Sequence, residues 1–184
     1  MMKFEFRPAK STQAGAYLLR RNGGDMDKYL FIKMLYLADR DSMAKWEEPI
    51  TGDNPTSMEF GPVLSNIYDL TKGDCPWARQ EWSPFISDAD SQTNRVTLIS
   101  DPGIRELSKA EINILESVFE RFHDFTWKQM KDYSHQLKEY DDPGKSSAPI
   151  KMDRIFAALG KTEQQIHEAE ASFRSIELAE AVFS

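Results

Sequence analysis

Cysteine is nearly absent from this chain of 184 residues, which contains Cys75 alone. A single thiol excludes a disulfide within the chain and any zinc site built from several thiolates. Long apolar runs are absent too: the longest, MLYLA at 34–38, falls far short of the ~20 residues that span a bilayer. The first residues, MMKFEFRPAK, also lack an apolar run of signal-peptide length. We therefore expect a cytoplasmic protein with no membrane partner.

Positive charge is in short supply, since 30 Asp and Glu face 23 Lys and Arg for a net charge of −7. This balance opposes attraction to phosphate backbones, so we expect no direct binding of nucleic acid. A helix-turn-helix at residues 108–139 is disfavoured on the same ground, because acidic residues interrupt the lysines of its second helix. A basic or mixed protein surface is a better electrostatic match, although an acidic balance also simply keeps many cytosolic proteins soluble.

The common signatures of catalytic and cofactor sites are missing as well. The chain has no G-x-x-x-x-G-K-[ST], G-x-G-x-x-G, G-x-S-x-G or H-E-x-x-H motif, and its three histidines are at least twelve residues apart. We predict no enzyme, no cofactor and no metal. Two arrangements of a small hydrolase stay open as alternatives: a divalent ion between Asp39, Asp41 and Asp53, or an acid–base pair of Asp53 and His135.

Apolar residues, in contrast, recur at helical spacing through most of the chain. We predict helices at residues 9–19, 25–46, 62–72, 108–123, 126–137 and 161–183. The second is apolar on so broad a face that it should form the centre of the core. Capping boxes at 108–111 and 126–129 mark two helix starts, and β-prone runs at 79–87 and 94–100 predict an antiparallel hairpin. The predicted class is mainly α (α+β), a compact helical domain with a small antiparallel β-sheet.

Residues 49–63, PITGDNPTSMEFGPV, concentrate turn-forming residues between two predicted helices; we call this segment the connector. Its Thr-Gly-Asp step is typical of a turn, and residues 57–60 can form a short extended piece. Pro62 suits the first position of a helix, where its missing N–H needs no partner, and Gly61 is an acceptable cap before it. The pattern predicts a connector of fixed shape that ends one helix, reverses the chain and starts the next.

Three stretches together resemble the Panacea domain family, also called the SocA-like antitoxin-associated domain. They are FIKMLYLADRD, PITGDNPTSMEFGPVLSNIYDL and LSKAEINILESVFERFHDFTWKQMKDYSH, in the family's order and spacing over residues 27–135. The resemblance implies a mainly helical domain, here residues 1–145, from an antitoxin of bacterial, phage or prophage origin that neutralises a protein toxin by binding it. One member type is similar to a proteolytic adaptor that delivers its toxin to the ClpXP protease, so this alternative stays open.

The resemblance also carries the family's recurring positions onto this sequence. The positions expected to contact a partner are Asp39, Asp53, Tyr68 and His135, and those expected to shape the connector are Thr51, Gly52, Gly61, Pro62 and Val63. Residues 146–184 form a helical extension beyond the matched span, which we expect to pack on the same domain. The alternative is that its Phe173, Ile176, Val182 and Phe183 face another chain, which includes a second copy in a homo-oligomer.

Overall fold

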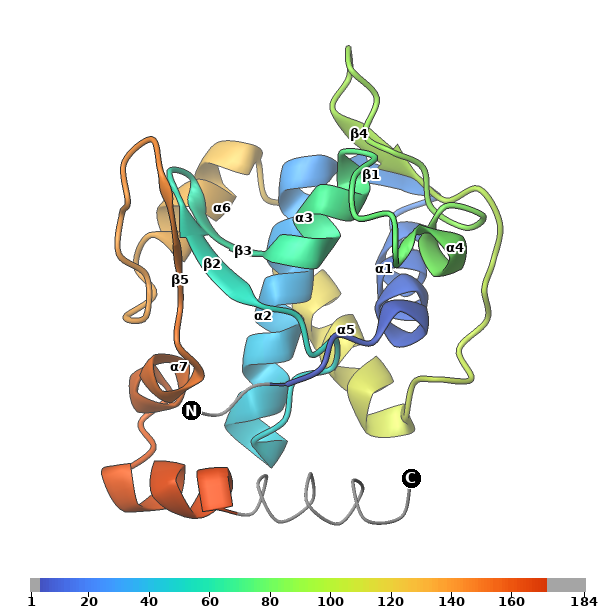
Figure 1. Ribbon diagram of the computed structural model, residues 1–184. Coiled ribbons are helices and arrows are strands. Elements are labelled where there is room, and N and C mark those ends of the chain that lie inside the picture. The colour runs from blue at the N-terminus through green and yellow to red at the C-terminus, as the bar shows by residue number, and fades with distance from the viewer. Residues whose placement is uncertain (1–3, 172–184) are drawn as a thin grey trace.

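The computed structural model describes residues 4–171 (Figure 1). In chain order the elements are α1 (Pro8–Arg21), β1 (Asp25–Asp27), α2 (Lys28–Trp46), β2 (Pro55–Met58), β3 (Gly61–Leu64), α3 (Ser65–Thr71), α4 (Arg79–Trp82), β4 (Arg95–Thr97), α5 (Lys109–Phe122), α6 (Trp127–Ser134), β5 (Ser147–Pro149) and α7 (Met152–Ala158), and a further helix starts at residue 163. The predicted class is confirmed, because helices surround two small antiparallel sheets. Within residues 4–171, every helix is too short or too polar to cross a membrane.

Helix α2 runs through the middle of the molecule (Figure 1). Its residues 31–39 are all buried, with α1, α5 and α6 packed around it and β3 on a further side. The prediction that this helix forms the centre of the core is thus confirmed. Both predicted capping boxes are also present, and they start α5 and α6.

The predicted start of the central helix at residue 25 is wrong. Residues Asp25–Asp27 form β1, which pairs antiparallel with β4. The side chain of Asp27 then caps α2 by accepting the N–H groups of Tyr29 and Leu30. An acidic residue favours a helix N-terminus both as a cap and in the first turn, so the sequence alone did not separate the two placements.

The helix predicted at 62–72 starts three residues later than expected. Gly61–Leu64 form β3, which pairs with β2 so that Pro62 lies opposite Ser57. Pro62 is therefore a strand residue and not the first residue of a helix. A strand tolerates a proline at an edge, and β3 is an edge strand in the order β3-β2-β5.

The predicted hairpin of residues 79–87 and 94–100 is reduced to one bridge, between Ile86 and Leu98. The first run begins as the short helix α4, and β4 in the second run pairs with β1. The hairpin prediction is therefore wrong in its first strand. Strand β1, which pairs with β4, lies about seventy residues earlier in the chain, and local β-propensity does not reveal such a distant partner.

The described part of the C-terminal extension contacts the rest of the molecule through a strand, a helix and side chains. Strand β5 pairs with the second edge of β2, and α7 lies near the lower half of α2 in Figure 1. A second apolar cluster joins Phe4, Met43, Ile150, Met152, Ile155, Phe156 and Ala169. The predicted residues Phe173, Ile176, Val182 and Phe183 lie outside the described residues, and the division of the chain at residue 145 stays a prediction.

Candidate functional site

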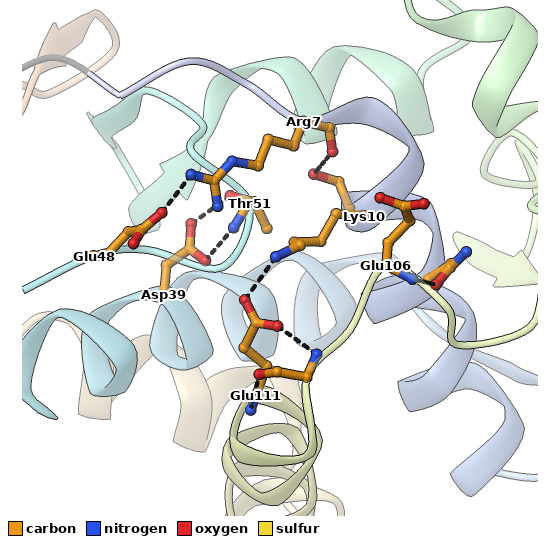
Figure 2. Close-up of polar contacts among 10 residues, drawn as sticks. Arg7, Lys10, Asp39, Glu48, Thr51, Glu106 and Glu111 are labelled. Atoms are coloured by element: carbon orange, nitrogen blue, oxygen red, sulfur yellow. Dashed lines mark hydrogen bonds and ion pairs between the residues drawn. The ribbon is translucent and has the colours of Figure 1, made fainter. Parts of the chain in front are cut away.

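Asp39, a residue of α2 that is only 2% exposed, fixes the first part of the connector. Its Oδ1 accepts the backbone N–H of Thr51 at 2.9 Å, and its Oδ2 forms a hydrogen bond with the Thr51 hydroxyl (Figure 2). The turn that follows α2 is thereby tied back onto the helix it has just left. Asp39 joins two segments of the chain that lie twelve residues apart.

The same hydroxyl continues the chain of hydrogen bonds to Asp53. Thr51 Oγ1 accepts the N–H of Asp53 at 3.1 Å. Asp53 Oδ1 accepts the N–H of Asn54 at 2.6 Å, and also the N–H and Nδ2 of Asn66 at 3.0 and 2.8 Å. Its Oδ2 accepts the N–H of Ile67 at 2.9 Å. Leu64, the residue before α3, has no side chain that can cap this helix. The buried carboxylate of Asp53 in the connector caps it instead.

Gly52 lies between Thr51 and Asp53, at the point where the N-terminal segment passes close to the connector. Its φ is +68°, and a Cβ added there would overlap with the backbone carbonyl of Glu5. The N–H of Arg7 donates to the carbonyl of Thr51 at 2.9 Å, and the Arg7 side chain pairs with Glu48 (Figure 2). Glycine is required here because both its backbone angle and the close approach of a second backbone exclude a side chain.

Burial controls the charge of the two carboxyl groups. It raises the pKa of Asp39 to about 7, against the opposing effect of the hydrogen bonds from Thr51. Burial also raises the pKa of Asp53, whose hydrogen bonds from Ile67, Asn66 and Asn54 act in the opposite direction. Asp39 therefore exchanges a proton near neutral pH while its oxygens remain bonded to the connector.

Asp39 should make the free energy of unfolding fall as the pH rises from about 4 to about 7. The unfolded chain loses this proton near the usual pKa of 3.8, whereas the folded chain holds it to about pH 7. In this window the folded chain binds one proton more, which contributes a fall of about 1.4 kcal/mol per pH unit that ends above the folded pKa. In Asp39→Asn, the amide replaces the protonated acid, since it accepts from the Thr51 N–H and donates to the Thr51 hydroxyl.

Urea denaturation at several pH values between about 5 and 7 measures this contribution. The free energy of unfolding of Asp39→Asn, relative to the unchanged protein, should rise steadily across the window because only the latter binds the extra proton. Parallel pH profiles of the two proteins would contradict the raised pKa of Asp39.

The last part of the connector, around Gly61 and Pro62, is enclosed by α2 and α6. Lys33, a buried residue of α2, donates from Nζ to the carbonyl of Pro62. Gly61 has a φ of +100°, and a Cβ there would meet both the Ser134 hydroxyl and Lys33 Nζ. Val63 is buried in the main apolar cluster. The turn between β2 and β3 thus approaches two helices more closely than a residue with a side chain would allow.

Of the four predicted partner-contacting residues, Asp39 and Asp53 are brought together through hydrogen bonds to Thr51. Asp39 and Asp53 are buried and bonded to Thr51, whereas Tyr68 is a partly buried residue of α3. The ring of His135 lies 4.6 Å from that of Tyr140, and its Nε2 is buried with no hydrogen-bond partner among residues 4–171. Contact of these residues with a partner stays a prediction, and for the two aspartates it would require a change in the surface that covers them.

The two hydrolase arrangements find no support in the described residues. Asp53 is bonded to the start of α3 and makes no hydrogen bond with His135. Asp41 pairs with Arg121 and does not join Asp39. Within residues 4–171, no three His, Cys, Asp or Glu side chains lie close enough together to hold a metal ion.

Two buried ionisable side chains were not predicted from the sequence. Glu139, fully buried after α6, accepts from Arg40 Nε at 2.6 Å, from Arg40 Nη2 at 3.2 Å and from the Tyr36 hydroxyl at 2.9 Å. Lys33 is the second group. Lys33 and Arg40, the partner of Glu139, both belong to α2, and the signal that could have revealed them is their place in a helix that is apolar on more than one face.

The fold and the site define a compact helical domain built around a rigid connector. The chain belongs to the family described as antitoxin SocA-like, Panacea domain, whose model matches residues 31–140. The matched part runs from the buried half of α2 through the connector to Tyr140 and includes all four predicted contact residues. No curated protein and no solved structure matches the chain. Family membership supports an antitoxin-type role, suggests a non-enzymatic one and implies a protein partner.

Proposed function

We propose that this protein is an antitoxin that neutralises a cognate protein toxin by binding it directly. The observation that carries the proposal is the family match, which covers residues 31–140 and thus the connector with both of its anchors. The chemistry of the described residues agrees with a binding role, because the buried carboxylates of Asp39, Asp53 and Glu139 accept hydrogen bonds from their own chain. These groups hold the shape of a surface and leave no reactive pair exposed.

The rigidity of the connector favours such a role physically. A surface that is already ordered before binding loses less conformational entropy when the complex forms. Asp39, Thr51 and Asp53 fix one end of the connector, and Lys33 fixes the other. The β2–β3 turn between these ends is therefore presented in one conformation.

Co-expression with a growth-arresting product of an adjacent gene tests the proposal. Growth should be restored, and a complex should purify without nucleotide or metal, whereas an unrelated protein expressed at the same level should give neither result. After translation is halted, the abundance of the toxin should be unchanged or increased, because binding protects a folded partner from proteolysis.

Two outcomes would count against direct neutralisation. If no adjacent product is toxic, or if one remains toxic when this protein is in excess, the antitoxin proposal is wrong. Rapid loss of the toxin that depends on ClpX would favour the proteolytic adaptor.

A further inference from the structure

A pocket of about 390 Å³ lies where the β2–β3 turn meets the first turns of α2. Tyr29, Ile32 and Lys33 line it from α2, Phe60 lines it from the turn, and Tyr68 lines it from α3. This volume falls within the range of ~300–1,000 Å³ that is typical of binding pockets. The walls are mainly aromatic and aliphatic, so the pocket can accept a large apolar side chain.

Three side chains hold the turn that forms one wall of the pocket by donating hydrogen bonds to its backbone carbonyl groups. The hydroxyl of Tyr29 donates to the carbonyl of Phe60, and Lys33 Nζ donates to that of Pro62. The hydroxyl of Tyr140 donates to the carbonyl of Met58 at 2.9 Å. The wall therefore exists before any partner arrives, which lowers the entropic cost of filling the pocket.

An exposed aromatic patch, formed by Phe60, Tyr29 and Trp127, adjoins the pocket. Phe60 is 45% exposed and Trp127 is 55% exposed, and the Tyr29 ring lies 6.2 and 6.3 Å from them. Lys131 Nζ lies 5.0 Å from the Phe60 ring. Contiguous exposed aromatic rings are uncommon on monomeric surfaces and are typical of the residues that dominate protein–protein binding.

The charge of the pocket is opposite in sign to that of the whole chain. Lys28 and Lys145 supply its positive charge, with the buried amine of Lys33 beneath them, and Glu59 is the one acidic lining residue, whereas the chain has a net charge of −7. Within residues 4–171, none of these three lysines pairs with a carboxylate. Lys33 is 2% exposed, and burial lowers its pKa well below the usual value. An incoming carboxylate would thus find unpaired cations at the rim and a buried amine beneath them.

We propose that the pocket and the aromatic patch together dock an acidic segment of the cognate toxin. One large apolar side chain of that segment enters the pocket lined by Ile32, Phe60 and Tyr68, and the carboxylates of the segment face Lys28 and Lys145. This inference rests on the proposed antitoxin function and names the surface that performs it. It also assigns a role to the connector, because the turn that these hydrogen bonds hold places Phe60 in the aromatic patch.

Reversal of the rim charges tests the acidic partner. In the double variant Lys28→Glu, Lys145→Glu, the dissociation constant for the toxic product of the adjacent gene should rise about tenfold or more at low salt, and the difference should shrink as salt is added. The matched control is Arg105→Glu, Lys109→Glu, which changes the net charge equally at two exposed cations. Lys109 is the first residue of α5. Because α5 begins at the opposite end of the molecule from the start of α2 (Figure 1), the control should bind normally.

Truncation of the exposed rings tests the anchor. In Phe60→Ala, Trp127→Ala the dissociation constant should rise about a hundredfold, as is typical of central aromatic contacts, with little change in thermal melting because both rings are half exposed. The control Trp77→Ala, Ile99→Ala removes two comparably exposed apolar side chains elsewhere.

The outcomes separate this surface from the function itself. If both test variants bind the toxin as tightly as their controls while the unchanged protein restores growth, the docking surface is wrong and the antitoxin proposal stands. A tighter complex after the charge reversal would overturn the acidic segment. If the unchanged protein forms no complex with the toxin, the proposed function fails and the docking surface fails with it.

Discussion

Replacement of Asp53 by alanine should lower the free energy of unfolding by about 3–5 kcal/mol, a large share of the 5–15 kcal/mol typical of a domain. The carboxylate accepts four hydrogen bonds from Asn54, Asn66 and Ile67. Truncation would leave these donors without their partner, with the N–H of Ile67 in a buried position, and α3 would lose its cap. The denaturant midpoint, followed by circular dichroism, measures the loss.

The matched control is Asp53→Asn, which keeps the size of the side chain. Its Oδ1 can retain the bonds from Asn54 and Asn66, but its amide nitrogen would face the N–H of Ile67, donor against donor. We expect an intermediate loss of about 1–2 kcal/mol. If the alanine variant is as stable as the unchanged protein, Asp53 does not serve as this cap. A loss of toxin affinity in Asp53→Asn without any loss of stability would instead support the predicted contact with the partner.

Local sequence patterns predicted the longer helices and the caps of α5 and α6, because those signals lie within a few residues of one another. The capping boxes that start α5 and α6 are examples, since both partners of each box are three residues apart. The central position of α2 followed from its unusually broad apolar face. Gly61 and Pro62 show the limit of such patterns, because a Gly-Pro step suits an edge strand as well as a helix start.

The candidate site depends on contacts between separate segments of the chain, and no local sequence pattern contains these contacts. Asp39, Thr51 and Asp53 were singled out by the family resemblance, yet their sequence alone does not show that the Thr51 hydroxyl links the carboxyl group of Asp39 to the backbone N–H of Asp53. The pocket is harder still to predict, because its walls come from α2, the β2–β3 turn, α3 and the segment before β5. Exposed aromatic residues can be recognised as a patch only once the fold places their rings together.

The ion pair of Arg40 and Glu139 should produce the second large effect. The carboxylate has no exposed surface and receives two bonds from the guanidinium and one from the Tyr36 hydroxyl. Arg40→Ala would leave a buried carboxylate without its cation, and removal of one partner from such a pair typically costs about 3–5 kcal/mol. We therefore expect a lower denaturant midpoint and weaker ordering of the segment that leads from α6 to Tyr140.

The double variant Arg40→Met, Glu139→Leu separates the cost of breaking this ion pair from the net contribution of the pair. Both side chains become apolar, so no unpaired charge remains, and replacement of a buried ion pair by packed apolar groups is often neutral or stabilising. The double variant should therefore unfold at a higher denaturant concentration than Arg40→Ala, although the Tyr36 hydroxyl loses its acceptor. Should Arg40→Ala prove as stable as the unchanged protein, the buried carboxylate would not need this cation, and the stabilising role assigned to the pair would be wrong.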